Sequence, residues 1–372
     1  MNILQVLPAL NSGGVERGTV EIAEALVTAG HNSHLISNGG RLVATLTQQG
    51  SIHHQLPVHS KNPWHIWRNA SLISDFVRKQ DIELIHVRSR APAWSAKLAS
   101  QQTDVPLLST FHGMYGHHSM LKRIYNSAML SGQACIAVSD FIAQHIAQTY
   151  PKHPKLVTIH RGIDTQAFSP ETVSDARKQI LLEQWSLKSE QTKVILLPGR
   201  LTRLKGHALF IEALAQVKHE FLALIVGDQT SSEAYIGELQ TLIDKKQLQG
   251  RVRFVGACDD MPAAYAVADI VVSASTKAES FGRTACEAQA MEKLVTVADH
   301  GGTRETLCPQ LHNAAFEPGS SRSLATCLNM LLAIDSNEAK ELGRSARAHI
   351  EKHYPLEKMC AKTLALYQQL IS

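Results

Sequence analysis

Two acidic side chains, Glu279 and Glu287, stand eight positions apart around a segment that could bind an anion. The apolar run at 270–272 predicts a strand before Glu279, and strong helix formers follow Ser280-Phe281-Gly282, so Glu279 is expected in a strand-to-helix loop. A helix start presents unpartnered N–H groups and positive potential, so residues 280–283 could hold a phosphate. Glu287, about one turn further along, could accept two hydroxyl hydrogen bonds from a ribose diol. This layout is typical of a nucleotide-sugar site.

This segment resembles the signature of a known enzyme family. The two glutamates, with Ser280-Phe281-Gly282 after the first and Ala288 after the second, resemble the retaining GT-B glycosyltransferases, in particular family four of the glycosyl transferases group 1. The resemblance implies a nucleotide-diphosphate sugar as donor. The chain departs from the family pattern after the helix, where Glu292-Lys293-Leu294-Val295 replaces the usual Gly-x-Pro-Val. That turn is ordinarily a packing feature, so the departure concerns local geometry more than chemistry.

The elements that must position these residues alternate along the whole chain. Short β-rich runs, beginning with Ile3–Leu7, alternate with helical patterns such as Val15–Ala29, and the alternation restarts at Val194–Leu197. This pattern predicts an α/β protein with doubly wound parallel sheets, whose ligands bind beyond the carboxyl ends of the strands. A chain of 372 residues has ample length for two such domains.

A polar segment at residues 170–177 is expected to link the two halves. We therefore predict a first domain at residues 1–168 and a second at residues 169–355. The resemblance implies a GT-B fold, in which two Rossmann-like domains face a cleft, the first binding the acceptor and the second the donor. It also implies that the last helix, at residues 356–372, packs back on the first domain.

Bulk composition excludes several classes of function. The formal net charge of +4 and the pI of about 8.7 are too weakly basic for a nucleic-acid-binding face. The six cysteines are scattered without a C-x-x-C pair, which predicts reduced core residues in a cytoplasmic protein and no zinc site. No apolar run approaches the ~18–20 residues that cross a bilayer, so any membrane contact is expected to be peripheral, at the inner face of the cytoplasmic membrane.

The first loop after a strand contains Gly13 and Gly14, followed by Glu16. Paired glycines let the backbone approach a ligand closely, although such a pair is in itself often only a turn. The loop lacks the G-x-G-x-x-G pattern, which counts against an NAD-linked dehydrogenase. In the resembled family a Gly-Gly-x-Glu loop approaches donor diphosphate and acceptor, which implies donor contacts for Gly13 and Gly14 and an acceptor contact for Glu16.

Basic side chains follow the next two strand-like runs. Arg88 and Arg90 are either solvated surface or a clamp for an anionic group, and our hypothesis is that they contact an acidic acceptor such as a lipid-linked or phosphorylated saccharide. His112 follows Leu107–Phe111, where a lone histidine is more often structural. The family places the histidine of a Thr-x-His-Gly segment near the donor sugar, which implies that role for His112.

An amphipathic helix is predicted beyond that histidine, because apolar residues recur at helical spacing from Met120 to Met129 while basic residues occupy another face. The apolar stripe either packs into the core or meets a membrane surface or lipid acceptor. A second departure from the family pattern follows, since Arg161-Gly162-Ile163-Asp164 stands where members often show Asn-Gly-x-Asp. The resemblance therefore carries only Gly162 and Asp164, as structural residues.

Two cations, Arg200 and Lys205, lie between Gly199 and Gly206 after the first strand of the second half. Basic loop residues are usually solvated, but these flank a strand-to-helix turn and can converge on an anion at the helix start. The segment resembles the family motif Gly-Arg-Leu-x-x-x-Lys-Gly. The resemblance implies that Arg200 and Lys205 bind the donor diphosphate, with Gly199 beside them.

Two later loops also carry family features. Gly256 follows a strand where the family seats the nucleobase, and Glu305 ends a Gly-Gly-x-x-Glu segment that implies a contact with the donor sugar. Asp259-Asp260 resembles the metal-binding pair of the other glycosyltransferase fold. A helix begins directly after it at Met261-Pro262, so we interpret the pair as helix-capping residues.

The implied reaction is transfer of a sugar, UDP sugars being among the expected donors, with retention and without a metal or other cofactor. Arg200, Lys205 and the amides near residues 280–282 would stabilise the leaving diphosphate. Glu279 would orient the sugar hydroxyls, and His112 would support the transition state near the sugar.

The expected acceptor is a saccharide or a lipid-linked saccharide. Mild basicity, the arginine loop and the amphipathic helix favour a cell-envelope acceptor such as a lipopolysaccharide precursor, with peripheral contact to an anionic membrane. Two alternatives remain open. A non-hydrolysing nucleotide-sugar epimerase shares the fold and would turn over donor without acceptor. A sugar-nucleotide-binding protein that has lost catalysis is disfavoured by the complete set of Arg200, Lys205, Glu279 and Glu287.

Overall fold

The computed structural model describes residues 1–11, 13–116, 119–150, 152–187, 192–229 and 233–372. The chain divides into two compact units, one formed by Met1–Gly162 with Leu356–Ser372 and the other by Ile163–Pro355. Each unit is built around one parallel sheet. The predicted α/β class, with two doubly wound parallel sheets, is therefore confirmed.

The first unit holds a seven-stranded sheet in the order β3-β2-β1-β4-β5-β6-β7, with all neighbours parallel. Its strands are β1 Asn2–Val6, β2 Asn32–Ser37, β3 Ile52–Gln55, β4 Leu84–Val87, β5 Leu107–Phe111, β6 Ala134–Ala137 and β7 Lys155–Thr158. Its helices are α1 Gly14–Thr28, α2 Val43–Gln48, α3 Pro63–Lys79, α4 Arg90–Thr103, α5 Met120–Ser127, α6 Asp140–Thr149 and α15 Leu356–Ile371. The strand order reverses between β1 and β4, where ligands bind in sheets of this kind.

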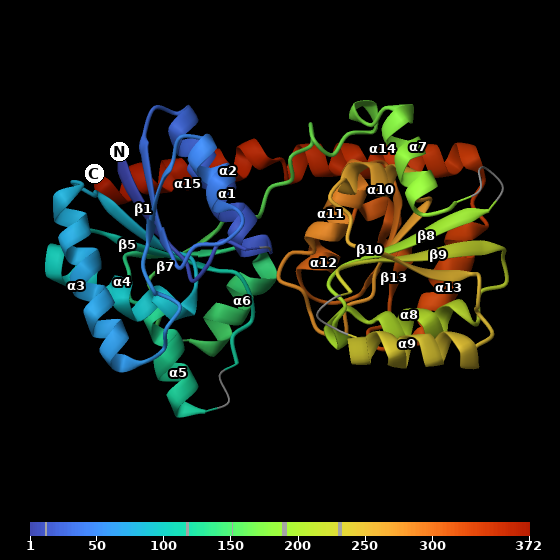
Figure 1. Ribbon diagram of the computed structural model, residues 1–372, viewed down its shortest axis with the longest axis horizontal. Coiled ribbons are helices and arrows are strands. Elements are labelled where there is room, and N and C mark those ends of the chain that lie inside the picture. The colour runs from blue at the N-terminus through green and yellow to red at the C-terminus, as the bar shows by residue number, and fades with distance from the viewer. Residues whose placement is uncertain (12, 117–118, 151, 188–191, 230–232) are drawn as a thin grey trace. The chain divides into compact units, whose positions relative to one another are not determined.

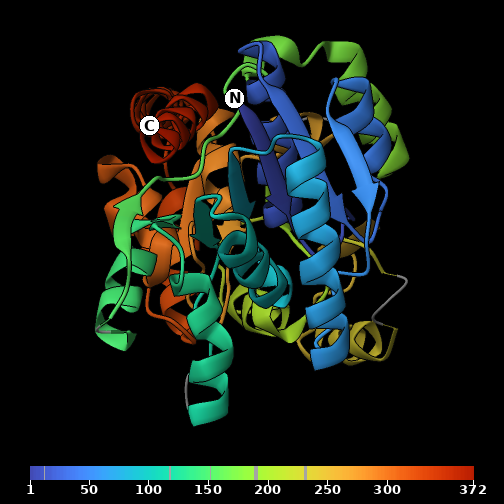
Figure 2. The same cartoon turned by 90° about the vertical axis from the view of Figure 1, so that its left-hand side faces the viewer.

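Helices cover both faces of this sheet (Figures 1 and 2). Helices α3 and α4 pack together on one face, and α1 and α15 pack together on the other. Side chains alternate accordingly, since Leu4 belongs to the core under α3 and α4 whereas Ile3 belongs to the core under α1 and α15. Burial on both faces explains why the strands read as nearly continuous apolar runs.

The second unit holds a six-stranded parallel sheet in the order β10-β9-β8-β11-β12-β13. Its strands are β8 Lys193–Pro198, β9 Phe221–Val226, β10 Val252–Gly256, β11 Ile270–Ser273, β12 Leu294–Ala298 and β13 Ala315–Phe316. Its helices are α7 Asp175–Gln184, α8 His207–Leu214, α9 Glu233–Lys245, α10 Met261–Val267, α11 Arg283–Ala290, α12 Gly301–Thr306, α13 Ser321–Leu332 and α14 Ser336–His353, with a short 3-10 helix, η3, at Arg203–Lys205. Here the order reverses between β8 and β11.

Helices again form two layers in the second unit. Helix α8 packs with α9 and α13 on one side, whereas α7 packs with α10 and α11 with α14 on the other (Figure 1). The loops that follow β8 and β11 therefore begin side by side at the carboxyl edge of the sheet. These are the loops to which the sequence analysis assigned Arg200, Lys205 and Glu279.

The division between the units falls after Gly162, whereas the sequence analysis placed it after residue 168. Residues 163–168 pack with the second unit, because Ile163 donates its backbone N–H to the Tyr354 carbonyl at 2.9 Å and both Ile163 and Phe168 lie in the second core. The expected linker at residues 170–177 is also more ordered than predicted. It forms a 3-10 helix at Pro170–Thr172 and the start of α7.

Glu292 occupies the position where the resembled family usually has glycine. Its φ of 58° lies in the left-handed region, directly after the end of α11. Its backbone N–H donates to the Gln289 carbonyl at 3.0 Å, so the turn that glycine favours is retained. A non-glycine residue pays roughly 1–2 kcal/mol for this conformation. Glu292 therefore takes the left-handed conformation that glycine favours, at the cost of local backbone strain.

All six cysteines are free, as predicted. Cys135, Cys286, Cys308 and Cys327 are buried, and burial raises the pKa of the Cys135 and Cys286 thiols to about 12. Among the described residues, no helix combines the length and the apolar character needed to cross a lipid bilayer.

Candidate functional site

Lys205 and Glu279 form an ion pair at the carboxyl edge of the second sheet. Lys205 ends η3 after β8, Glu279 lies in the loop after β11, and Lys205 Nζ donates to Glu279 Oε1 at 2.6 Å. The Ser275 hydroxyl donates to the same oxygen. Burial by itself would raise the pKa of Glu279, but the Lys205 charge and the hydrogen bonds from Lys205 and Ser275 outweigh burial and lower it. The structure thus brings together two of the predicted catalytic residues, both charged.

Arg200 and Arg203 are further basic residues of the segment between β8 and α8. Arg200 follows Gly199 and is exposed. Arg203 is turned away into an ion pair, with Nη2 2.6 Å from Glu238 Oε2. Of these two arginines, Arg203 is therefore held by a protein partner, whereas the roles predicted for Arg200 and Lys205 stay predictions.

Close backbone contacts hold the two loops together. A Cβ on Gly206 would lie only 1.8 Å from the Ala274 carbonyl oxygen, so glycine lets the turn that carries Lys205 rest against the end of β11. A Cβ on Gly302 would lie 2.4 Å from the Ser280 carbonyl oxygen, and Gly302 N donates to the Glu279 carbonyl at 2.8 Å. Larger residues at either glycine would separate the segments that position the charged pair.

Glu287 is buried in the second unit, with 5% of its surface exposed. Arg283 Nε donates to its Oε1 at 2.9 Å and Tyr265 Oη to its Oε2 at 3.0 Å. Protein donors therefore hold both oxygens and fix the carboxylate in place on α11. Phe281 is only 2% exposed and its side chain packs against Tyr354, so this side chain belongs to the core and does not face a ligand.

Three other residues follow or end strands at the carboxyl edge of the second sheet. His300 Nε2 donates to the Ser275 carbonyl at 3.0 Å, and its charge is among the influences that lower the pKa of Glu279. Glu305 lies on α12 and is half-buried, and Gly256 ends β10 with a left-handed φ of 81°. Of these, His300 was not predicted.

In the first unit, Arg161 joins the Gly13-Gly14 loop to His112. One guanidinium nitrogen donates to the Gly14 carbonyl, and the other, Nη2, lies 2.6 Å from His112 Nδ1. Glu16, in the first turn of α1, folds back over Gly13, where an added Cβ would lie 2.6 Å from Glu16 Oε2. The glycine loop, Glu16 and His112 are therefore neighbours at the carboxyl edge of the first sheet.

Arg88 and Arg90 do not point to the same place, although both follow β4. Arg88 is buried, with 4% exposed, and its Nη1 donates to Gln5 Oε1 at 3.1 Å. The Arg90 guanidinium stacks over the Tyr115 ring at 4.2 Å and donates to Asn126 Oδ1 at 3.3 Å. The two arginines therefore do not form one clamp, and Arg88 is the one that lies beside His112.

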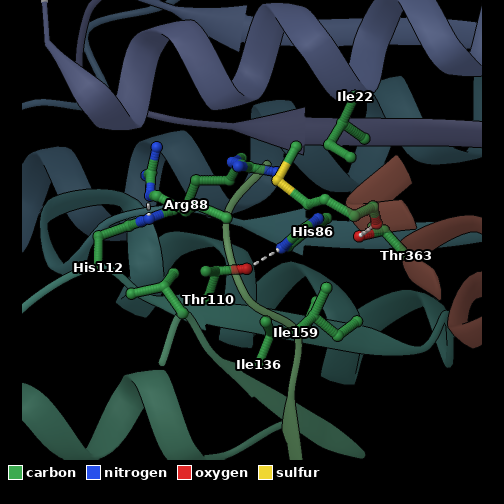
Figure 3. Close-up of a pocket in the computed structure, with 11 residues that line it drawn as sticks. Ile22, His86, Arg88, Thr110, His112, Ile136, Ile159 and Thr363 are labelled. Atoms are coloured by element: carbon green, nitrogen blue, oxygen red, sulfur yellow. Dashed lines mark hydrogen bonds between the residues drawn. The ribbon is translucent and has the colours of Figure 1, made fainter. Parts of the chain in front are cut away.

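Arg88 and His112 line a small cavity of about 20 Å³ (Figure 3). His86 spans its floor, with Nε2 2.7 Å from Thr110 Oγ1 and Nδ1 2.6 Å from Tyr367 Oη of α15. Burial first, and then the Arg88 charge, hold the pKa of His86 well below its ordinary value. The C-terminal helix thus contributes a side chain to the network beneath His112.

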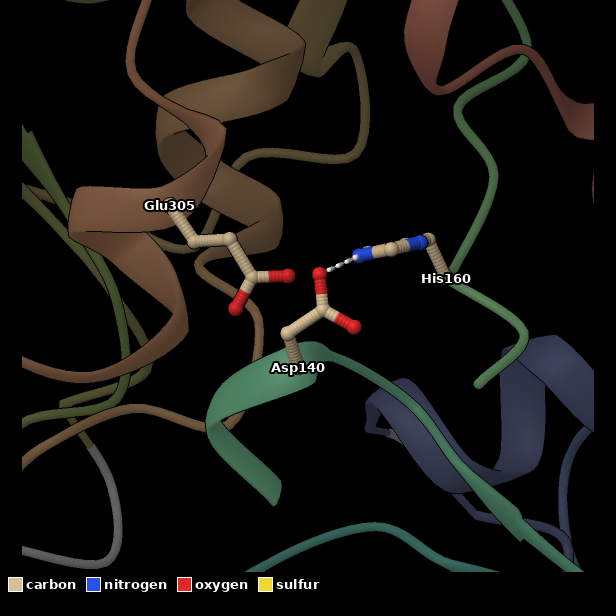
Figure 4. A group of neighbouring side chains, drawn as sticks. All are labelled: Asp140, His160 and Glu305. Atoms are coloured by element: carbon tan, nitrogen blue, oxygen red, sulfur yellow. Dashed lines mark ion pairs between the residues drawn. The ribbon is translucent and has the colours of Figure 1, made fainter. Parts of the chain in front are cut away.

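Two aspartates at helix starts, Asp260 and Asp140, have structural partners. Asp260 accepts from Ala263 N at 3.0 Å and pairs with Arg177 at 2.6 Å, which confirms its expected capping role on α10. Asp140 Oδ2, in the first turn of α6, lies 3.6 Å from His160 Nε2 (Figure 4). This pair joins the helix start to the segment that follows β7.

The sequence analysis did not predict site roles for Arg161, Ser275 or His300. Ser275 has a recognisable signal, because it stands four positions before Glu279 in a strand-to-helix loop. Arg161 was visible only as a departure from a family pattern, since its contact with His112 joins residues 49 positions apart.

Comparisons with known proteins agree with this architecture. Residues 12–167 match the model of Glycosyltransferase Family 4, and residues 180–349 match that of Glycosyl transferases group 1. A solved glycosyltransferase from Rickettsia africae ESF-5 is 37% identical, with a TM-score of 0.93 over 100% of this chain and 98% of that one. Anabaena Alr3699/HepE, solved in complex with UDP and glucose, is 23% identical, with a TM-score of 0.86 over 99% of this chain and 100% of that one, and shows the fold alone.

Among curated proteins, N-acetyl-alpha-D-glucosaminyl L-malate synthase from Bacillus anthracis is 22% identical over 98% of this chain and 95% of its own length. The two family models cover the two sheets in turn, and the Rickettsia structure matches the chain from end to end. The protein therefore belongs to the glycosyltransferases of the GT-B fold, with a Glycosyltransferase Family 4 region followed by a Glycosyl transferases group 1 region.

Proposed function

We propose that the protein transfers a sugar from a nucleotide-diphosphate sugar to a saccharide or lipid-linked acceptor, with retention of the anomeric configuration. The observation that carries the proposal is the charged pair of Lys205 and Glu279 at the reversal point of the second sheet, 2.6 Å apart; the segment that carries Lys205 also carries exposed Arg200. A donor of the UDP series is favoured because Anabaena Alr3699/HepE has been solved with UDP and with UDP-glucose.

The leaving diphosphate sets the main demand on the site. When the bond between the anomeric carbon and the phosphate oxygen breaks, negative charge develops on the diphosphate. Arg200, Lys205 and the amides around Ser280–Gly282 would stabilise it in a preorganised way, without a metal ion. The acceptor oxygen would form the new bond on the same face, while its proton passes to the departing phosphate oxygen. Glu279 would orient the sugar hydroxyls during this step.

Other residues at the carboxyl edges of the sheets are proposed to make the remaining contacts with the donor. Glu287 would accept the ribose hydroxyls and the Gly256 loop would seat the base. The diphosphate and sugar would also meet Gly13 and Gly14, Glu305 and His112. Support comes from their positions at the carboxyl edges of the two sheets, where parallel α/β sheets bind ligands.

A thermal-shift panel tests the donor site. With UDP, GDP, ADP, dTDP and CMP added separately, one nucleoside diphosphate is expected to raise the melting temperature, because a ligand at about 100 times its Kd adds about 2.7 kcal/mol to the free energy of unfolding. The shift is expected with EDTA as well as with Mg²⁺. No shift with any nucleotide would contradict the proposed donor site, and a shift that requires Mg²⁺ would contradict its metal independence.

On the acceptor side, we propose a cell-envelope saccharide such as a lipopolysaccharide precursor, reached at an anionic membrane surface in the cytoplasm. Glu16 and Arg90 would contact this acceptor, whereas Arg88 is buried and held by Gln5. The support is α5, whose residues Met120 and Leu121 are 78% and 79% exposed.

The two alternatives for the apolar stripe apply to different parts of it. Met120, Leu121 and Ile124 on α5 are exposed, whereas Ala128 and Met129, after the helix, are buried in the core. The exposed part lies beside basic residues, a composition that suits anionic lipid headgroups.

A second exposed aromatic site lies at the start of α3, where Trp64 and Trp67 stack with ring centroids 5.7 Å apart. Both α3 and α5 begin beyond the carboxyl ends of strands, and Figure 2 shows the start of α3 and α5 toward the same end of the first unit. Tryptophan is favoured at membrane interfaces, which adds to the support for membrane contact.

Replacing Met120, Leu121 and Ile124 together with Ser is expected to abolish flotation with anionic liposomes. Each apolar side chain that leaves water contributes about 1.5–3 kcal/mol, so the triple change should weaken membrane partition by roughly 10³-fold or more. Ile180→Ser is the matched control, because Ile180 is equally exposed, at 65%, but lies on α7 of the other unit. A wild-type protein that stays at the bottom of the gradient with every lipid mixture would contradict the membrane proposal.

A further inference from the structure

The two ring nitrogens of His112 have different surroundings. Nδ1 lies 2.6 Å from Nη2 of Arg161. A guanidinium has only donors, so this hydrogen bond requires Nδ1 to be the acceptor. The ring proton must then reside on Nε2, and His112 is the neutral Nε2–H tautomer.

His112 Nε2 is buried and has no hydrogen-bond partner among the described residues. A buried donor left without an acceptor costs about 1–3 kcal/mol, so such groups in native proteins usually have a further partner. His112 lines the small cavity that Arg88 and Thr110 also line (Figure 3). The orphaned N–H is therefore available to an oxygen atom that none of the described residues supplies.

The charges around His112 keep the ring neutral. Burial, followed by the charges of Arg161, Arg88 and His86, holds the pKa of His112 well below its ordinary value. The other titratable neighbour is Tyr115, which is hydrogen-bonded to the main chain of His112. The groups that shift the pKa of His112 all disfavour the imidazolium, and the Glu16 carboxylate at the same sheet edge folds back over Gly13.

We propose that Arg161 is a positioning residue that holds His112 as the Nε2–H tautomer, so that this N–H donates to an oxygen atom of the sugar nucleotide during transfer. His112 then acts as a fixed neutral donor and neither removes nor supplies a proton. The identity of the oxygen that His112 contacts rests on the proposed sugar transfer. The assignment of the His112 tautomer rests only on the contact with Arg161.

Arg161 suits this role because one guanidinium makes two contacts. The nitrogen that does not contact His112 donates to the Gly14 carbonyl, so Arg161 sets the ring and the glycine loop together. An asparagine, which the resembled family often has here, carries a single amide group and also an acceptor oxygen. Only a side chain with donors alone imposes the acceptor role on Nδ1 without ambiguity.

NMR of the full-length protein labelled with ¹⁵N-histidine tests the tautomer directly. Two-bond ¹H–¹⁵N correlations distinguish Nε2–H, Nδ1–H and imidazolium, and the His112 signals are those missing from His112→Gln. The wild type is expected to show neutral Nε2–H throughout about pH 5.5–8, across the ordinary histidine pKa. An Nδ1–H ring, or an imidazolium at pH 7, would overturn the inference even if transfer activity is found.

Variants then test whether Arg161 is responsible. In Arg161→Met, the His112 ring is expected to become a mixture of tautomers, and the pKa of His112 to rise. The kcat at pH 7 is expected to fall by about 10–10²-fold, and the rate should fall further at acid pH, where His112 becomes protonated. Arg161→Lys retains a side chain that only donates and should restore Nε2–H in part. Arg88→Met, which removes a nearby charge without touching Nδ1, should keep the wild-type tautomer.

Two outcomes separate this inference from the proposed function. An unchanged Nε2–H ring in Arg161→Met would remove the positioning role of Arg161, whatever the protein catalyses. Correct tautomers in all four proteins, with no transfer from any nucleotide sugar, would remove the proposed function and leave the Arg161–His112 assignment in place. If Arg161→Met does not fold, the wild-type and Arg88→Met spectra still decide the tautomer, and Arg161→Lys decides whether Arg161 sets it.

Discussion

Lys205→Ala is expected to lower kcat/KM for sugar transfer by about 10²–10³-fold, the loss typical when one well-aimed donor to a developing charge is removed. The ammonium of Lys205 lies at the carboxyl edge of the second sheet, held 2.6 Å from Glu279, where the leaving diphosphate is proposed to bind. Its removal also leaves Glu279 without its cationic partner, so the pKa of Glu279 is expected to rise. Steady-state kinetics with the donor found by the thermal-shift panel measure the effect.

Arg203→Ala is the matched control for that variant. Arg203 belongs to the same short helix as Lys205, but its guanidinium pairs with Glu238 and not with Glu279. Its loss should change kcat/KM by less than about threefold, because exposed ion pairs are worth about 0–1 kcal/mol. An effect of less than about tenfold for Lys205→Ala would contradict the proposed role of Lys205.

The overall fold was predictable because both sheets are buried on two faces. Strands such as β1 and β11 then appear in sequence as short apolar runs, and the helices between them as amphipathic segments. The carboxyl ends of these strands coincide with the loops that carry Gly13, Arg200 and Glu279. The position of the unit boundary was less predictable, since the burial of Ile163 and Phe168 depends on which core they reach.

The charged residues of the site were partly predictable as well. Lys205 and Glu279 are 74 positions apart, yet they meet because β8 and β11 are neighbours in a sheet of this order. Phe281 shows the limit of motif reasoning, since its place in the signature suggested a ligand contact but its side chain fills the core. A motif identifies the segment, and only packing decides whether a side chain or the main chain faces the ligand.

The side-chain contacts of Arg88, Arg90 and Arg161 could not be predicted from the sequence. Arg88 and Arg90 share a loop, yet Gln5 holds one and the Tyr115 ring the other, because the start of α4 turns successive side chains apart. Arg161 approaches His112 from the segment after β7, two strands away in the sheet. Contacts of this kind depend on the distance between loops at one sheet edge, which the pattern of apolar residues does not encode.

Glu279→Gln is expected to reduce kcat by about 10–10²-fold while leaving the affinity for the nucleoside diphosphate unchanged or higher. A hydrogen bond that involves a charged group contributes about 1.5–3 kcal/mol, which is the loss expected when the carboxylate no longer orients the sugar. The diphosphate itself gains, because the change removes a negative charge and releases Lys205 from the carboxylate that now holds it. Calorimetric titration with the nucleoside diphosphate and kinetics with the nucleotide sugar measure the two effects separately.

The effects of the two variants on affinity for the nucleoside diphosphate distinguish Lys205 from Glu279. Lys205→Ala should weaken binding of the nucleoside diphosphate and slow transfer, whereas Glu279→Gln should slow transfer alone. Ser275→Ala serves as the control, because it removes the hydroxyl donor to the same Glu279 oxygen but retains both charges, and its effect on kcat should stay below about tenfold. If Glu279→Gln weakened diphosphate binding as much as Lys205→Ala, Glu279 would act mainly by holding Lys205 in place, and its proposed contact with the sugar would be wrong.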